Sequence, residues 1–325
     1  MAYARGRKYG KLQFEFRIIG KDDYLVNRSR IADISLLLVA MMWGSTFLIV
    51  QYAVRVLPPM AFNSARFLGA ALLLALIITL FYRSQWKLIS GRMLLHACLL
   101  GLFLFIGYAF QTAGLLYTTT SNAGFITGLS VVLVPFISYA LLKHSISRFT
   151  WISALLAAAG LYLLTFAGSG MSLNKGDVLV FVCAIGFALH IGYTGVYAGR
   201  YPSLLLAALQ MAVVGVFSLI ASALTEHVGN AADLMEKLTE PNVLWALAVS
   251  IGPTSAFAFW IQTVCQKYTT PSRVAIIYAT EPVFAALTGI LFAGERLTLF
   301  GGIGCLCILA GMVIAELKSA PQKVQ

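Results

Sequence analysis

Long apolar stretches with almost no charged residue inside them dominate the chain. A helix needs about 20 mostly apolar residues to cross a bilayer, and only helices or closed barrels leave no backbone group unpaired in lipid. These stretches are about twice as long as a barrel strand and do not alternate between apolar and polar residues. The sequence therefore predicts an all-α integral membrane protein with ten transmembrane helices, at 32–54, 59–82, 93–116, 118–142, 149–167, 177–199, 201–225, 242–266, 274–294 and 297–317.

The composition excludes the soluble classes of protein. Of the 325 residues, 60% are hydrophobic and only 11% are charged, whereas about 25% of the residues in soluble domains are charged. So few charged residues cannot cover the surface of a soluble domain of this size. A soluble enzyme, a disordered chain and a secreted disulfide scaffold are excluded. The sequence also lacks nucleotide-binding, hydrolase and metal-ligand motifs, so we expect no enzyme activity, no cofactor and no metal.

The distribution of Lys and Arg predicts the orientation in the membrane. Residues 1–31 carry eight Lys/Arg and no apolar run of the kind that a signal peptide needs. With the N-terminus in the cytoplasm, inside segments hold 18 basic residues and outside segments 4, and without the tail the ratio is still 10 to 4. We therefore expect a multi-pass protein of the cell membrane with basic tail 1–31 and C-terminal tail 318–325 both cytoplasmic. The basic excess is interpreted as a topology signal and not as nucleic-acid binding.

The chain also matches itself when it is shifted by 151 residues, without a gap over about 50 residues. Apolar composition does not explain the polar matches, so a duplication is indicated. Asp33 and Asp177 open the first helix of each half. The polar matches are Gln111-Thr112 with Gln262-Thr263, and Tyr117-Thr118-Thr119 with Tyr268-Thr269-Thr270.

Each half, 32–167 and 176–317, is predicted to hold five helices. Five is an odd number, so the halves cross the membrane in opposite directions. Inverted-topology repeats of this kind are typical of transporters that work by alternating access. The Gly and Pro residues within the spans indicate weaker breaks than the unwound segments of some transporters, so we expect no ion site formed by a discontinuous helix.

Several short motifs, in this order, resemble the drug/metabolite transporter superfamily, specifically its EamA-type members with ten helices. The resemblance covers roughly 31–317 and implies transport of small metabolites, often export of amino acids or xenobiotics. The first half departs from the second, because Ser130-Val131 and Lys143-His144 stand where the second half has Glu281-Pro282 and Gly294-Glu295. The motifs are Trp43-Gly44-Ser45-Thr46-Phe47, Ala65-Arg66-Phe67, Tyr117-Thr118-Thr119, Thr280-Glu281-Pro282-Val283-Phe284 and Gly294-Glu295-Arg296-Leu297-Thr298.

Two charged residues lie well inside predicted spans. A carboxylate near the bilayer centre costs about 2.5–3.5 kcal/mol on insertion scales, so Glu281 must face the protein interior, be paired or be protonated. It is a candidate partner for a substrate ammonium group or a proton, or else a structural acid. Arg66 is the candidate counter-charge or gate. At about 1.5 Å per residue the two differ by roughly 10 Å in depth, so Arg66 is equally a residue that binds helix carbonyls.

Other polar and aromatic residues inside the spans are candidates for the lining of a substrate cavity. For each of them, interhelical hydrogen bonding is the alternative role. His190 is a candidate titrating group or a packing residue. The lining candidates are Trp43, Ser45, Thr46, Gln111, Asn122, Trp260, Gln262 and Tyr278, with Tyr193 a weaker one.

The leading functional hypothesis is a secondary or facilitative transporter, in the exporting direction, of small organic metabolites such as amino acids or xenobiotics. A membrane-embedded enzyme and a channel are the alternatives. The expected partners are a small-molecule substrate and the lipid bilayer. Coupling to a proton or a counter-substrate, and a homodimer, are left open by the sequence.

Overall fold

A computed structural model of the chain describes residues 21–118, 120–142, 146–166, 174–227, 229–293 and 298–317. Within these ranges every regular element is helical. Seven helices are long and apolar enough to cross a membrane, and the apolar helices Arg148–Leu164 and Leu299–Ala315 are shorter. The prediction of an all-helical membrane protein is confirmed.

The helices of the first half are α1 (Lys21–Val56), α2 (Pro59–Phe81), the 3₁₀ turn η1 (Arg83–Leu88), α3 (Gly91–Gly114), α4 (Thr120–Gly128), α5 (Ser130–Leu142) and α6 (Arg148–Phe166). The second half holds α7 (Lys175–Tyr197), α8 (Ser203–Thr225), α9 (Ala231–Thr239), α10 (Pro241–Ile251), the π-helical segment η2 (Gly252–Phe257), α11 (Ala258–Cys265), α12 (Pro271–Tyr278), α13 (Glu281–Ala293) and α14 (Leu299–Leu317).

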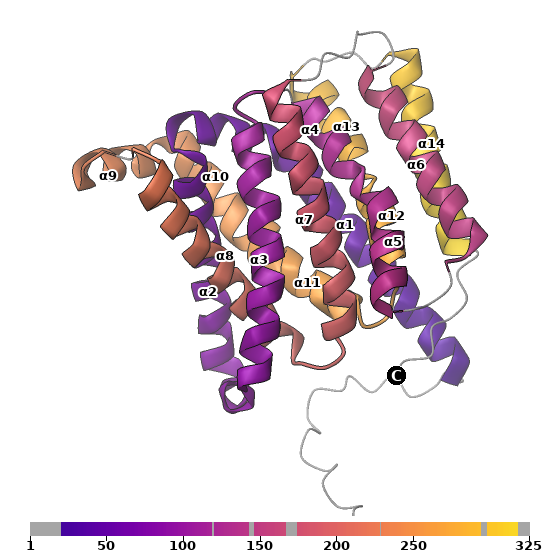
Figure 1. Cartoon of the computed structure of the whole chain (residues 1–325), viewed down its shortest axis with the longest axis horizontal. Coiled ribbons are helices and arrows are strands. Elements are labelled where there is room, and N and C mark those ends of the chain that lie inside the picture. Colours follow the sequence, from indigo (N-terminus) through magenta and orange to yellow (C-terminus); the bar gives the residue numbers. More distant parts are fainter. Residues whose placement is uncertain are drawn as a thin grey trace, which may run out of the picture.

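The long helices run side by side in one bundle, and α9 projects sideways at one end (Figure 1). The pairs α2 with α8, α3 with α7 and α6 with α14 pack along their lengths. The last pair forms one edge of the bundle (Figure 1). There a Cβ atom at Gly160 would lie 2.6 Å from the carbonyl oxygen of Gly304, so only glycine permits this backbone approach.

Large apolar side chains cover the outside of the bundle. Leu72, Leu95, Leu224, Leu291 and Leu306 are each more than 65% exposed. Such exposure would be a liability in water, but it is the expected surface toward lipid tails. Apolar residues on both the inner and the outer face are the reason why hydropathy locates these helices well.

Two expectations from the sequence are wrong at the level of single helices. First, α1 begins at Lys21 and not at residue 32. Second, the helices expected at 118–142 and 274–294 are each interrupted, between α4 and α5 at Leu129 and between α12 and α13 at Ala279-Thr280. Of the expected tails 1–31 and 318–325, residues 1–20 and 318–325 lie outside the described residues, and residues 21–31 form the start of α1.

The second interruption has a local cause. The backbone N–H and the hydroxyl of Thr280 both donate to the carbonyl oxygen of Ile277, at 3.0 and 2.6 Å, which closes a tight turn. Pro282 then occupies the first turn of α13, where a missing backbone N–H costs no hydrogen bond. The pair Glu281-Pro282 therefore starts a new helix in the middle of the bundle.

Candidate functional site

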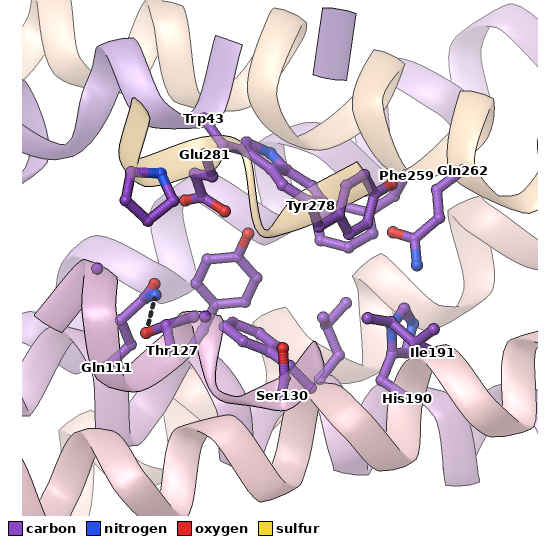
Figure 2. Close-up of a pocket in the computed structure, with 16 residues that line it drawn as sticks. Trp43, Gln111, Thr127, Ser130, His190, Ile191, Phe259, Gln262, Tyr278 and Glu281 are labelled. Carbon is purple, nitrogen blue, oxygen red and sulfur yellow. Dashed lines mark hydrogen bonds between the residues drawn. The ribbon is translucent and has the colours of Figure 1, made fainter. Parts of the chain in front are cut away.

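A small cavity of about 50 Å³ lies in the centre of the bundle, between the two interrupted helices and α1, α3, α7 and α11 (Figure 2). Such a volume holds a few water molecules. Five of the lining residues are aromatic, six are polar and the rest are small or aliphatic. They are Trp43, Tyr108, Phe187, Phe259 and Tyr278; Gln111, Thr127, Ser130, His190, Gln262 and Glu281; and Leu104, Gly124, Gly128, Ile191 and Pro282.

The carboxylate in this wall belongs to Glu281, the first residue of α13. Its side chain points into the cavity (Figure 2) and is half-buried. Within the described part of the chain it makes neither a hydrogen bond nor an ion pair. The positive end of the α13 dipole stabilises the carboxylate at this position. Gly44 of α1 permits this arrangement, because a Cβ atom there would collide with the backbone carbonyl oxygen of Glu281.

Arg66 is 4% exposed and does not line the cavity. Its Nε donates to the Ser255 hydroxyl at 2.7 Å and its Nη2 to the Thr254 carbonyl at 3.2 Å, both in the π-helical segment. The guanidinium also lies 4.7 Å from the ring centre of Tyr108. Arg66 and Glu281 form no ion pair with each other. Of the two roles considered from the sequence, the contact to the Thr254 carbonyl matches the one in which Arg66 binds a helix carbonyl, and the π-helical segment supplies that carbonyl.

The aromatic walls are held in fixed orientations. Trp43 donates from Nε1 to the Thr254 carbonyl at 2.8 Å. Its ring lies 4.9 Å from Tyr278 in an edge-on contact and 5.3 Å from Phe259. Tyr108 contacts Phe187 edge-on at 5.0 Å. These contacts fix the ring faces that the cavity presents.

The two glutamines of the cavity differ in their hydrogen bonding. Gln111 donates from Nε2 to the Thr127 hydroxyl at 3.2 Å. Gln262 is 1% exposed, yet neither its amide oxygen nor its amide nitrogen has a partner, and the Tyr278 hydroxyl is likewise unpartnered. Figure 2 shows Gln262 near His190, at the end of the cavity away from Gln111. Here the wall carries hydrogen-bonding capacity that the described protein does not use.

His190 is tied to its neighbours. One ring nitrogen lies 2.8 Å from the amide oxygen of Gln210 and 3.4 Å from the Thr194 hydroxyl, and Gln210 donates in turn to Thr263 at 3.3 Å. The imidazole is 2% exposed. Both contacts are made by the same ring nitrogen, Nε2, and the imidazole also lines the cavity.

The structure places several sequence candidates outside the cavity lining. The hydroxyl of Ser45 accepts a hydrogen bond from Thr288 at 3.3 Å, and Thr46 donates to its own helix at the Trp43 carbonyl. Asn122 donates to Asp177 at 3.5 Å. Two further candidates also lie outside the lining. Trp260 contacts Phe257, and Tyr193 contacts Phe103 and Tyr197.

Conversely, the sequence analysis missed the aromatic residues Tyr108, Phe187 and Phe259. A signal for them exists. Each lies three residues before a polar residue of the wall, namely Gln111, His190 and Gln262. Residues three apart share a helix face.

At each end of the bundle lies a cluster of polar side chains that contains one aspartate. In the first, here called the Asp33 cluster, Arg273 contacts the Asp33 carboxylate at 2.6 Å and the Ser29 hydroxyl at 3.4 Å, with Arg28 donating to the Tyr268 hydroxyl at 3.1 Å. It joins α1 to α12 and to the segment before it.

The second, the Asp177 cluster, lies at the start of α7. Asp177 accepts from the Thr118 hydroxyl at 2.5 Å, from Asn122, and from the backbone N–H of Asn174 at 2.9 Å. The last contact is half of a capping box, in which Asn174 accepts from the Asp177 N–H. This cluster joins α7 to α4 and to the segment before it.

Comparison with known proteins gives a family and a fold. A family model described as the EamA-like transporter family matches the chain twice, at residues 30–166 and 174–316. A protein of Archaeoglobus fulgidus named "Uncharacterized transporter" is 33% identical over 288 residues, which cover 88% of this chain and 86% of that protein. The Escherichia coli K12 protein "Uncharacterized inner membrane transporter YedA" is 26% identical over 287 residues, 85% of this chain and 87% of that one.

A protein of known crystal structure has the same fold, with a TM-score of 0.73 and 18% sequence identity, over 88% of this chain and 96% of that chain. A multi-pass bundle with these relatives is a membrane transporter. Two consecutive matches to one family model cover most of the length of this chain, and the chain therefore belongs to the EamA-like transporter family. The resemblance inferred from the motifs is thereby confirmed.

Proposed function

We propose that the chain is a secondary or facilitative carrier, in the exporting direction, for a small organic solute. In this proposal ten membrane-spanning segments form two inverted five-helix repeats and work by alternating access. Three of these segments are α4–α5, α10–α11 and α12–α13. The observation that carries the proposal is the central cavity, because its wall is built from residues that the repeat relates in pairs.

The cavity pairs follow the 151-residue offset of the sequence. The interruptions at Leu129 and Thr280 are also 151 residues apart, so both halves break the corresponding helix at the same point. A further pair, Trp43 with Phe187, has the 144-residue spacing of Asp33 and Asp177. A cavity whose opposite walls are equivalent lies where a two-fold axis would pass. The pairs with the 151-residue offset are Tyr108 with Phe259, Gln111 with Gln262, Thr127 with Tyr278, and Ser130 with Glu281.

The two end clusters obey the same offsets. Asn122 of the Asp177 cluster corresponds to Arg273 of the Asp33 cluster, and Thr118 corresponds to Thr269, the neighbour of Tyr268 in the Asp33 cluster. With the proposed topology the Asp33 cluster closes the cytoplasmic end and the Asp177 cluster the outer end. Both are formed here, and the cavity is much smaller than the roughly 300–1,000 Å³ of ligand pockets. Opening of one cluster at a time would give alternating access to the same cavity.

Glu281 supplies a plausible site for coupling. A carboxylate binds a proton or a cationic solute but not both, which is the logic of exchange. Among the described residues, the ionisable groups around it are Arg66, Cys183 and the hydroxyls of Tyr108 and Tyr278, with His190 further along the cavity wall. In this scheme protons move inward as the solute moves outward.

Counterflow in proteoliposomes tests the proposal. Vesicles loaded with unlabelled solute should take up labelled solute faster than empty vesicles, because a carrier returns faster when it is loaded. A channel shows no such stimulation, and an enzyme would convert the solute, which chromatography of the vesicle contents detects. Absence of trans-stimulation with every solute of a panel of amines, amino acids and sugars would refute the carrier.

A further inference from the structure

We infer that the solute is a small organic monocation with an apolar, preferably flat, body and one uncharged hydrogen-bonding group, and not a zwitterionic amino acid. This inference rests on the proposed function and names the solute class of the same cavity. Among the described residues that line the cavity, Glu281 is the only acid and no Lys or Arg is present.

The charge that an amino acid requires is missing from the wall. A zwitterion needs a cationic partner for its carboxylate as well as an anionic partner for its ammonium group. Arg66 cannot serve without breaking its bonds to Ser255 and Thr254, and it lies against the Tyr108 ring. A carboxylate in the cavity would therefore meet no Lys or Arg of the described wall, and with His190 neutral it would be buried without a charged partner, which is unfavourable. A solute with a single positive charge can pair directly with the Glu281 carboxylate, which lines the cavity.

The rings around Glu281 suit the same cation. Trp43, Tyr108 and Tyr278 line the cavity together with the carboxylate. Ring faces attract ammonium groups, and this attraction is stronger where water is excluded. The ring of Phe187 and that of Phe259 extend the apolar wall, so a flat hydrocarbon or aromatic body packs along it.

The end of the cavity at Gln262 is suited to a neutral hydrogen-bonding group on the solute. The Gln262 amide and the Tyr278 hydroxyl are buried, unpartnered and part of the wall. Buried polar groups normally have partners, and those without one need a reason. A hydroxyl group on the solute can accept from the Gln262 amide nitrogen or the Tyr278 hydroxyl and donate to the Gln262 amide oxygen. A carboxylate there could only accept.

Because the cavity is smaller than any such solute, binding must widen it and so favour one conformation over another. Binding is then visible as a rise in the melting temperature of the purified protein. Tyramine is the positive probe, since it is a monocation with a flat ring and a hydroxyl group. Tyrosine differs from tyramine only by its carboxylate, 4-ethylphenol lacks the charge, and phenethylamine lacks the hydroxyl.

Tyramine should raise the melting temperature and bind at least about tenfold more tightly than tyrosine or 4-ethylphenol. Glu281→Gln should weaken tyramine binding at least about tenfold and leave 4-ethylphenol unchanged, because only the cation loses its partner. Tyr278→Phe should reduce the preference for tyramine over phenethylamine. The matched control is Glu236→Gln on α9, an exposed acid remote from the cavity, which should bind like the parent.

Measurements on the parent protein are sufficient to refute the inference, so the test does not depend on the folding of the variants. Tight binding of tyrosine, or no binding of tyramine, would overturn it. Counterflow separates this inference from the proposed function. Trans-stimulated exchange of a sugar or an amino acid, with no tyramine binding, would keep the carrier and overturn the cation. Tyramine binding without trans-stimulated exchange of any solute would keep the cation and overturn the carrier.

Discussion

The two end clusters lead to a prediction in which two matched substitutions act in opposite directions. Asp33→Asn removes the charge that Arg273 binds, and Asp177→Asn removes the charge that Thr118 and the Asn174 backbone bind. Both replacements keep the size of the side chain. If the clusters close opposite ends, the first variant should favour opening to the cytoplasm and the second opening to the outside.

The expected size follows from the geometry. The Asp33–Arg273 contact is 2.6 Å, and the two side chains are 7% and 11% exposed. Loss of one partner costs about 3–5 kcal/mol in a fully buried pair and about 0.2–1 kcal/mol in an exposed one. Both groups are hydrated again when this end opens, so we expect about 2 kcal/mol, or about a 30-fold shift in the ratio of closed to open.

For Asp177 the loss is smaller. Hydrogen bonds to a charged group are about twice as strong as neutral ones, and Asn still accepts from Thr118. Asn cannot replace the acidic half of the capping box at the start of α7 equally well. We expect about 1.4 kcal/mol, or a tenfold shift.

A reporter cysteine at Ser130 measures both shifts. It lies in the cavity wall, in a background from which the five native cysteines have been removed. A membrane-impermeant thiol reagent is added to oriented vesicles from one side or the other. The labelling rate from the cytoplasmic side should rise about 30-fold with Asp33→Asn, and that from the outside about tenfold with Asp177→Asn.

A double-mutant cycle with Arg273→Gln tests the pair itself. Once Asp33 is replaced, Arg273→Gln should have little further effect on labelling, since the interaction is already lost. Two results would refute the reasoning. One is an increase from the same side in both variants, and the other is a change below about threefold with Asp33→Asn.

Three further predictions concern packing, coupling and topology. Gly160→Ala should lower the free energy of unfolding by about 1–3 kcal/mol, since its Cβ would meet the Gly304 carbonyl. Gly199→Ala is the control, because a Cβ atom there has open space and should leave the stability unchanged. Chemical denaturation followed by tryptophan fluorescence measures the free energy of unfolding of both variants. In the parent protein, uptake of a cationic solute should fall as the pH is lowered, because protons compete at Glu281, and Glu281→Gln should give a low and pH-independent rate in the same vesicle assay. Single cysteines in tail 1–20 and near Lys323 should resist an external thiol reagent while one at Met235 of α9 reacts, and the opposite pattern would reverse the topology.

Hydropathy predicted the long helices because lipid, and not water, is their solvent. Because lipid-facing and inward-facing residues are both apolar, hydropathy does not show which face of each helix points inward. A helix that is apolar on every side has no amphipathic stripe to show which face is inside. Glu281, Gln111 and Gln262 could be predicted as inward-facing because lipid cannot pair them. The aromatic wall residues Tyr108 and Phe259 carry no such signal of their own, since a ring packs equally well against lipid, and only their spacing of three residues from Gln111 and Gln262 indicates the face on which they lie.

The helix interruptions were missed for a different reason. No residue type at Leu129 indicates a break, and Pro282, which lies within the single helix expected at 274–294, stands in the first turn of a new helix. Only the packing around the turn at Thr280 decides between the two. The partners of Arg66 were equally hidden, because they depend on the π-helical segment, which has no sequence signature beyond Pro253.

That segment, η2, also makes the two halves of the protein differ in their response to a change in chain length. A π-helical turn takes up an extra residue, whereas the corresponding residues 101–106 of the first half lie in the regular helix α3. Each residue advances an α-helix by about 100°. Loss of a single residue within Gly252–Phe257 should therefore convert the π-helical turn to a regular α-helical turn and keep Phe259 and Gln262 on the cavity face. Residues 101–106 have no extra residue to absorb such a loss, so a deletion there should rotate the cavity residues of α3 by about 100° relative to the start of that helix.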